Sequence, residues 1–179
     1  MKILRRRQFG NPVLRQKTTR LSSARIQSGE IQDLIADMRN TLERRQYGVG
    51  LAAPQIGKSL ALSVIGIKPT PTRPELQRQN LVIINPEITK LYGKKDNMWE
   101  GCVSGAEMYA QVPRHKKVRL KWQDENAKTH EKNFAGFMAH VIQHEVDHLD
   151  GILFVDRVED TKTYMTFSEY KKMTRTKKA

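Results

Sequence analysis

The chain has 179 residues, of which 38% are hydrophobic and 28% are charged, a size and balance typical of one globular domain and not of a disordered chain. Its longest apolar run, residues 60–67, is much shorter than the roughly 20 residues that cross a bilayer, so we expect no membrane-spanning segment. The formal net charge of +13 lies mostly at the two ends; it attracts polyanions without specifying one, or is simply a basic surface.

The N-terminal segment is rich in arginine and has no acidic residue before Glu30, a composition shared with organellar transit peptides. Residues 10–12, Gly-Asn-Pro, are a turn signal, and residues 13–14 after them indicate the first strand of the domain itself. Cys102 is the only cysteine, which suits a reducing compartment. We therefore expect a cytoplasmic protein, with an organellar location as the alternative.

An amphipathic helix is predicted over residues 28–46, because its apolar residues recur at a spacing that lines one face. The helix ends before a segment in which Gly48 and Gly50 permit a tight backbone and a close approach of another chain. The apolar residues of the helix are Ile31, Leu34, Ile35, Met38 and Leu42.

Two β-rich runs follow, residues 60–67 and residues 80–84, and both are predicted to be buried strands. Residues 68–79 between them are polar with three prolines and indicate an exposed loop. Residues 117–122 alternate apolar and basic side chains, the pattern of a strand with one solvated face.

A second long helix is predicted over residues 133–149, where His144 and His148 share one face with apolar neighbours. A third, basic helix is predicted over residues 163–174. The whole pattern favours an α+β fold: mainly antiparallel strands packed around a central helix, with an N-terminal and a C-terminal helix. We expect a single domain over residues 1–179, with a basic helix or tail from about residue 163.

The predicted central helix contains His144-Glu145-Val146-Asp147-His148, an H-E-x-x-H segment. Its histidines lie one helical turn apart and can converge on one cation, while Glu145 can reach water beside that cation. A pattern of five residues also arises by chance, and two inward histidines can be ordinary core residues.

A hydrolytic metal site needs a third protein ligand and an open position for water. Downstream of the helix no histidine or glutamate occurs before Glu159, so a downstream ligand is disfavoured. Cys102, in Glu100-Gly101-Cys102-Val103-Ser104, is the other candidate, in a loop or edge-strand setting. A lone cysteine is otherwise a small buried hydrophobic residue.

Residues 48–57, Gly-Val-Gly-Leu-Ala-Ala-Pro-Gln-Ile-Gly, form a third motif, in which small residues allow close backbone approach and Gln55 can donate hydrogen bonds. Together the three motifs resemble the peptide deformylases, whose pattern is G-x-G-L-A-A-x-Q, then E-G-C-x-S, then Q-H-E-x-D-H. The resemblance spans nearly the whole chain, from residues 9–14 to residues 151–154.

The resemblance implies that Cys102, His144 and His148 bind one divalent metal ion, which makes the predicted central helix a metal-binding helix. Ferrous iron is the first expectation, with Zn²⁺, Ni²⁺ or Co²⁺ as alternatives. By the same resemblance Glu145 transfers protons, and the Gln55 side chain and the Val103 N–H stabilise the oxyanion. The resemblance also predicts a set of substrate-binding residues at the strand edge and the methionine pocket: Val49, Gly50, Leu51, Met98, Gly101, His140 and Val141.

The chain departs from the family pattern near the cysteine. Val103 stands where leucine is usual, Gly105-Ala106 replace Ile-Pro, and Tyr109 aligns with an arginine that faces substrate in some members. His140 replaces arginine or an aliphatic residue, and it is expected either to change the polarity of the pocket or to face solvent. These differences put the substrate range in question.

The resemblance implies a monomeric enzyme that removes the N-formyl group from the formyl-methionine of newly made polypeptides and releases formate. One alternative is a divergent paralogue that acts on another amide or has little activity. Another is a ribosome- or RNA-binding module with a structural metal, which intact Glu145 and Gln55 argue against. The basic C-terminus also fits docking of a deformylase to the ribosome surface.

Overall fold

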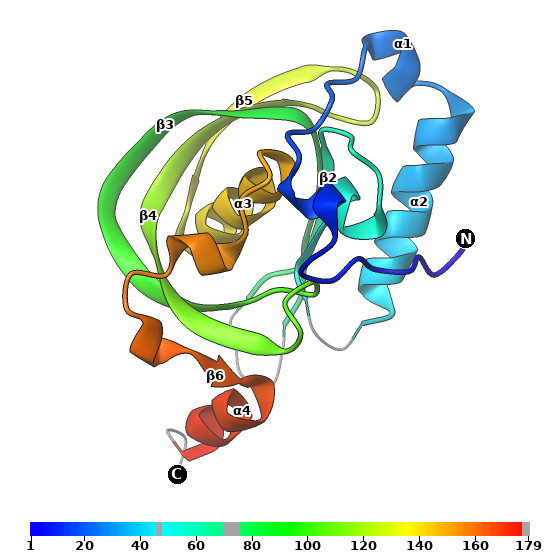
Figure 1. Cartoon of the computed structure of the whole chain (residues 1–179). Coiled ribbons are helices and arrows are strands. Elements are labelled where there is room, and N and C mark those ends of the chain that lie inside the picture. Colours follow the sequence, from blue (N-terminus) through cyan, green and yellow to red (C-terminus); the bar gives the residue numbers. More distant parts are fainter. Residues whose placement is uncertain (46–47, 70–75, 177–179) are drawn as a thin grey trace.

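One antiparallel sheet curves around a helix in the computed structural model, which describes residues 1–45, 48–69 and 76–176 (Figure 1). The strand order is β1-β2-β3-β4-β5, and the short β6 pairs with β4. The architecture is α+β. The strands are β1 (Gly50–Ala52), β2 (Leu62–Ile67), β3 (Gln79–Gly101), β4 (Met108–Gln123), β5 (Thr129–Ala135) and β6 (Met165–Thr166).

The long hairpin of β3 and β4 gives the sheet its curvature. Its pairing register shifts between Ile84 and Glu87, between Ile88 and Lys90, and between Tyr92 and Lys95, and such irregularities bend and twist a strand. The strand predicted at residues 80–84 is the first part of β3. Most of the remainder was missed because residues 85–101 are largely polar and contain a proline and glycines.

Helix α2 (Gly29–Glu43) confirms the predicted N-terminal helix, with Ser28 as its N-cap. Its apolar face packs on β1 and β2 in one core cluster. The helix ends at Glu43 with Arg44 as its C-cap, earlier than the predicted end at Gln46, which itself lies outside the described residues. The strand predicted at residues 13–14 is wrong: Pro12–Arg15 form a short 3-10 helix, because Asn11 Oδ1 accepts a hydrogen bond from the Val13 N–H at 3.2 Å.

Helix α3 (Gly136–Leu149) lies inside the curve of the sheet (Figure 1). The prediction began this helix at residue 133, but residues 133–135 finish strand β5. Gly136, with φ of +61°, adopts the left-handed backbone that lets the chain turn from strand to helix. Met138, Val141 and Ile142 then pack against the sheet in a second core cluster.

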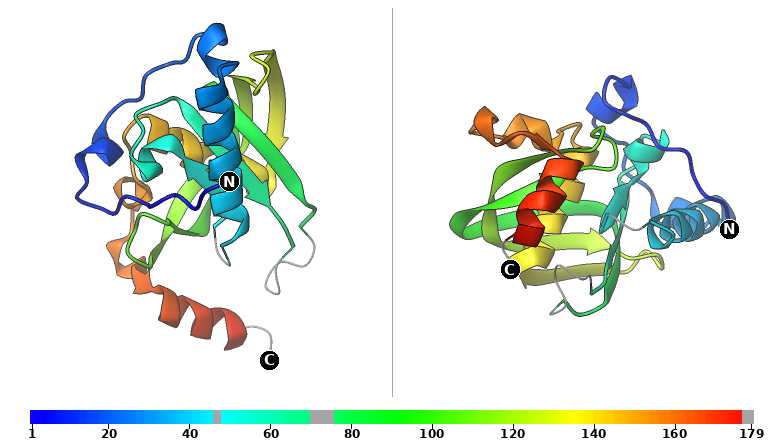
Figure 2. Two further views of the ribbon diagram at one scale, coloured as in Figure 1. Left: turned by 90° about the vertical axis from the view of Figure 1, so that its right-hand side faces the viewer. Right: turned by 90° about the horizontal axis from the view of Figure 1, so that it is seen from below.

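Helix α4 (Phe167–Thr176) begins later than predicted, because Thr161–Thr163 form a 3-10 helix and β6 precedes it. It lies at the edge of the molecule below the sheet (Figure 2). Residues 70–75 of the predicted loop 68–79 lie outside the described residues, and so do residues 177–179 of the basic C-terminus. None of the described helices is long and apolar enough to span a membrane.

Candidate active site

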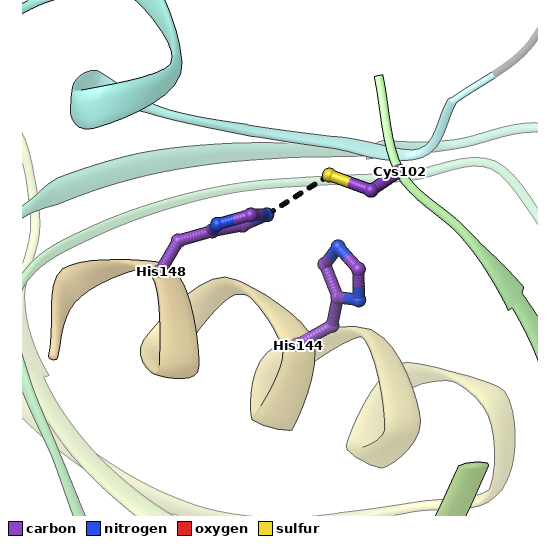
Figure 3. Close-up of side chains that lie close together, drawn as sticks. All are labelled: Cys102, His144 and His148. Atoms are coloured by element: carbon purple, nitrogen blue, oxygen red, sulfur yellow. Dashed lines mark hydrogen bonds between the residues drawn. The ribbon is translucent and has the colours of Figure 1, made fainter. Parts of the chain in front are cut away.

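Three potential metal ligands meet between α3 and the end of β3. His144 and His148 lie one turn apart on α3, and Cys102 follows directly after β3. Their ligand atoms all lie within 4.8 Å of one another, and Cys102 Sγ is 3.2 Å from His148 Nε2. Figure 3 shows the thiol and both imidazole rings directed toward one another. The cysteine, and not a downstream residue, is therefore the group that joins the two histidines.

Glu100 fixes the orientation of His144. Its Oε2 lies 2.7 Å from His144 Nδ1, so the other ring nitrogen is left to face Cys102 (Figure 3). Metal-binding histidines commonly use a carboxylate in this way. Although burial acts in the opposite direction, Cys102 and Glu100 raise the pKa of His144 well above its ordinary value. The neighbouring His148 shifts the other way, because burial and the charge of His144 lower its pKa well below the ordinary value.

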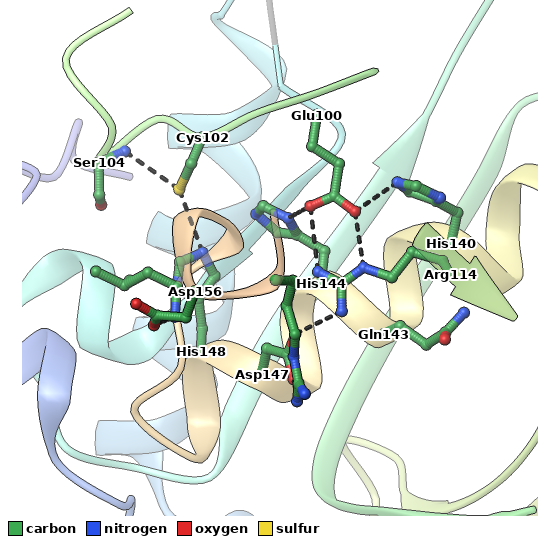
Figure 4. Close-up of polar contacts among 12 residues, drawn as sticks. Glu100, Cys102, Ser104, Arg114, His140, Gln143, His144, Asp147, His148 and Asp156 are labelled. Atoms are coloured by element: carbon green, nitrogen blue, oxygen red, sulfur yellow. Dashed lines mark hydrogen bonds and ion pairs between the residues drawn. The ribbon is translucent and has the colours of Figure 1, made fainter. Parts of the chain in front are cut away.

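Glu100 belongs to a buried network of ion pairs and hydrogen bonds (Figure 4). Arg114 Nε donates to Glu100 Oε1 at 2.8 Å, and Arg114 also donates to Asp147 on α3. Asp147 in turn accepts from Arg157 at 2.8 Å. Burial opposes ionisation of Glu100, yet hydrogen bonds from His140, His144 and Arg114 hold its pKa well below the ordinary value. The carboxylate is therefore charged and held by several donors.

His140 is a member of this network. Its side chain is only 6% exposed, and its Nε2 lies 2.6 Å from Glu100 Oε1. Of the two alternatives for His140, the one in which it faces solvent is therefore wrong. No sequence motif connects His140 with Glu100, because the two residues come from α3 and β3.

Glu145 lies on the side of α3 that faces β1. The residue is 3% exposed, and burial raises its pKa to about 7, while His144 acts in the opposite direction. A carboxyl group with this pKa can take up and release a proton near neutral pH. Gly50 provides the room: a Cβ there would lie 2.1 Å from Glu145 Oε1. The close backbone approach expected of the glycine-rich motif is thus an approach to Glu145.

Gln55 lies in the 3-10 helix η2 (Ala53–Ile56) and is 1% exposed. Its Oε1 accepts from the Ala52 N–H at 2.8 Å, which directs the amide nitrogen toward Cys102 Sγ at 3.2 Å and Ser104 Oγ at 3.3 Å. Val103 follows Cys102 in the turn between β3 and β4. The structure therefore brings Gln55, Val103 and the candidate ligands together.

The predicted substrate-binding residues come from three places around this cluster. Val49, Gly50 and Leu51 lie at β1, which is the edge strand of the sheet, although the Leu51 side chain is fully buried in the core. Met98 and Gly101 lie near the end of β3, where the Tyr109 ring covers Gly101. His140 and Val141 lie on α3, both about 5% exposed or less.

The segment after Cys102, where the chain departs from the family pattern, is a tight turn. Residues 103–107 form turns, and Ala106 and Glu107 have φ of +47° and +61°. Gly105-Ala106, which stand where the family pattern has Ile-Pro, therefore lie in a tight turn. A Cβ on Gly105 would lie 3.1 Å from Phe154 and 3.3 Å from Phe9, so the small residue accommodates a packed aromatic pair.

The family model for polypeptide deformylase matches residues 3–164. The chain belongs to the peptide deformylase family. A peptide deformylase of Leptospira biflexa is 45% identical over 160 residues, covering 87% of this chain and 88% of that protein. The family assignment makes the protein a hydrolase that removes the N-formyl group of newly made polypeptides, and the family uses a divalent metal ion.

Solved deformylase structures share the fold. The class I type b peptide deformylase of Acinetobacter baumannii bound to Met-Ala-Ser has 33% identity and a TM-score of 0.83, over 87% of this chain and 98% of that one. The deformylase of Synechococcus elongatus in complex with actinonin has 37% identity and a TM-score of 0.80, over 91% of this chain and 82% of that one.

Proposed function

We propose that Cys102, His144 and His148 hold the single divalent metal ion of this deformylase. The support is that their ligand atoms lie within 4.8 Å of one another and that Glu100 fixes the ring of His144. When bound, a divalent ion lowers the pKa of water and polarises a carbonyl oxygen. Two imidazoles and one thiolate suit Fe²⁺, our first choice, and also Zn²⁺, Ni²⁺ or Co²⁺.

Glu145 is the proton-transfer residue in this proposal. Its carboxylate takes the proton of the water that attacks the formyl carbon, and it later gives a proton to the leaving amine of methionine. Burial and the space beside Gly50 keep it next to the cluster without a competing side chain. The products are formate and a free N-terminal amine.

Gln55 and Val103 stabilise the oxyanion that forms when water attacks. The Gln55 Nε2 group already points at Cys102 Sγ from 3.2 Å, and the Val103 N–H follows the same cysteine in sequence. Two fixed donors at a buried site stabilise developing negative charge strongly, because they need no reorganisation during the reaction. Val103 in place of leucine preserves this backbone donor.

The substrate is the formyl-methionyl end of a nascent chain, which lies extended along β1. Within the described residues β1 pairs only with β2, and a free sheet edge can pair with a peptide backbone. The methionine side chain enters a pocket lined by Val49, Met98, Gly101, His140 and Val141. The Met-Ala-Ser peptide bound to the Acinetobacter baumannii relative supports a peptide of this kind.

A substrate panel tests the assignment of specificity. Formyl-Met-Ala-Ser is expected to be hydrolysed, whereas acetyl-Met-Ala-Ser is not, because the extra methyl group crowds the formyl site. Preference for another acyl group or first residue would instead indicate a paralogue whose cleft is altered by Gly105, Ala106 and Tyr109.

We further propose that residues 1–179 act as one catalytic domain, a cytoplasmic monomer, with α4 as a basic extension that contacts ribosomal RNA. Lys171 and Lys172 on α4 support this contact by their charge. Removal of residues 170–179 is expected to weaken salt-sensitive co-sedimentation of the protein with ribosomes. Unchanged co-sedimentation would refute the ribosome contact. The proposed monomeric state is tested separately, by measuring the molar mass with light scattering.

A further inference from the structure

The N-terminal segment is hydrogen-bonded to the 3-10 helix η2 and to the turn after Cys102, which carry the proposed oxyanion donors. The Arg7 N–H donates to the backbone oxygen of Gln55 at 2.7 Å, and the Phe9 N–H donates to the backbone oxygen of Ser104 at 3.0 Å. These bonds hold residues 6–9 beside the turn that follows Cys102. The arginine-rich segment is thus part of the surroundings of the candidate active site.

Arg6 and Gln8 both donate to the same backbone oxygen in that turn. Arg6 Nη1 lies 2.6 Å from the Val103 oxygen, and Gln8 Nε2 lies 3.2 Å from it. The peptide unit that carries this oxygen ends in the Ser104 N–H, which donates to Cys102 Sγ at 3.4 Å (Figure 4). The Val103–Ser104 amide therefore accepts a hydrogen bond from the charged Arg6 guanidinium at its oxygen, and it donates a hydrogen bond to Cys102 Sγ from its nitrogen.

Such an arrangement strengthens the bond to sulfur. A guanidinium is a strong donor, and an amide polarised at its oxygen becomes a better donor at its nitrogen because hydrogen bonds in a chain reinforce one another. Groups that orient a metal ligand in this way also tune the bound metal. We propose that Arg6 is a positioning residue, which orients the Cys102 sulfur and strengthens the hydrogen bond to it through the Val103–Ser104 peptide.

This inference rests on the proposed role of Cys102 as a metal ligand, and it assigns a function to a residue outside the three family motifs. Arg5 provides a matched control, because it carries the same charge one residue away and is exposed. Arg6→Gln and Arg5→Gln therefore change the net charge equally, and only Arg6→Gln removes the charged donor to Val103.

The test uses protein loaded with Co²⁺ and has two readouts besides activity. In Arg6→Gln, a chelator is expected to remove the ion roughly 10-fold faster than from the wild type. The sulfur-to-cobalt charge-transfer band is expected at lower energy, because the sulfur loses part of its hydrogen bonding. Arg5→Gln should match the wild type, and Arg6→Lys, which retains a charged donor, should lie between the wild type and Arg6→Gln.

Equal rates of metal loss and equal spectra for Arg6→Gln and Arg5→Gln would overturn the role of Arg6. A wild-type protein that binds Co²⁺ without any sulfur charge-transfer band would overturn Cys102 as a ligand, and this outcome is distinct because it needs no Arg6 variant. The unfolding temperature of each variant shows whether it is folded, and Arg6→Lys carries the comparison if Arg6→Gln does not fold.

Discussion

Tyr109 of β4 stacks on Tyr170 of α4, with ring centroids 4.4 Å apart and ring planes 13° apart. The Tyr109 ring also covers Gly101, where a Cβ would lie 2.4 Å from Tyr109 Cζ. Gly101 directly precedes Cys102, so the C-terminal helix is connected by a short series of contacts to the candidate metal site. Tyr109, which the sequence analysis places at a substrate-facing position by resemblance, thus contacts α4 in the structure.

Tyr170→Ala is expected to loosen α4. Aromatic pairs contribute about 0.5–1.5 kcal/mol beyond the burial of their area, so hydrogen exchange of α4 amides should become roughly 2- to 10-fold faster. Tyr170→Phe is the control, because it keeps the ring that stacks on Tyr109. Equal exchange in the two variants would show that the stack does not hold α4.

Gly50→Ala is expected to displace Glu145. The new Cβ would lie 2.1 Å from Glu145 Oε1, and a catalytic group misplaced by about 1 Å can cost roughly 100-fold in rate. We therefore expect kcat to fall by about this factor while the metal content stays unchanged. Gly29→Ala is the control, because nothing lies within 4 Å of the added atom; normal turnover in Gly50→Ala would contradict this role of the glycine.

Asp156 makes stability depend on pH. Burial raises its pKa, but hydrogen bonds from Arg15 and the Leu153 N–H outweigh this effect and hold the pKa below its ordinary value. A lowered pKa stabilises the fold above the unfolded value of about 3.9, and the contribution is lost as pH falls through the folded pKa. Asp156→Asn should therefore be less stable than wild type at neutral pH, and the difference in unfolding free energy should shrink in acid.

Arg15→Gln removes the other partner of this ion pair and should show the same pH dependence. A difference in unfolding free energy that stays constant from neutral to acidic pH, in either variant, would show that the Asp156 carboxylate is not the source of the effect.

Removal of the metal should abolish activity and lower stability. A ligand that binds only the folded state stabilises it by about 2.7 kcal/mol when its concentration is 100 times Kd, so a chelator should lower the unfolding temperature of the wild type but not of His148→Ala. With Fe²⁺ we expect activity to be lost in air, because a thiolate ligand is open to oxidation, and to be kept with Ni²⁺. A chelator without effect on the wild type would argue against the site.

The helices and the proximity of Cys102, His144 and His148 could be predicted, because each depends on local spacing or on a short motif. The i, i+4 spacing of His144 and His148 predicts one helix face, and the apolar stripe of residues 28–46 predicts α2. The ends of elements were less predictable. Gly136 ends β5 and starts α3 three residues later than expected, through a left-handed backbone that periodicity does not detect.

The supporting network could not be predicted, because its members are far apart in sequence. Glu100, Arg114 and Asp147 come from β3, β4 and α3, and only the folded sheet brings them together. In the sequence Arg6 is one of several arginines in the basic N-terminal segment, and nothing in that pattern indicates its hydrogen bond to the Val103 oxygen. Charge patterns report how many cations a segment has, and they do not identify the one that is partly buried beside a backbone oxygen.

The most direct test of the proposed site is formate release from formyl-Met-Ala-Ser by anaerobically purified, metal-loaded protein, compared with Glu145→Ala. General acid–base catalysis contributes roughly 10²- to 10⁴-fold, so we predict rapid turnover by the wild type and a loss of this size in the variant, with the metal still bound. Turnover that survives the substitution would contradict the role of Glu145, and a metal-loaded wild type that releases no formate would contradict the deformylase activity itself.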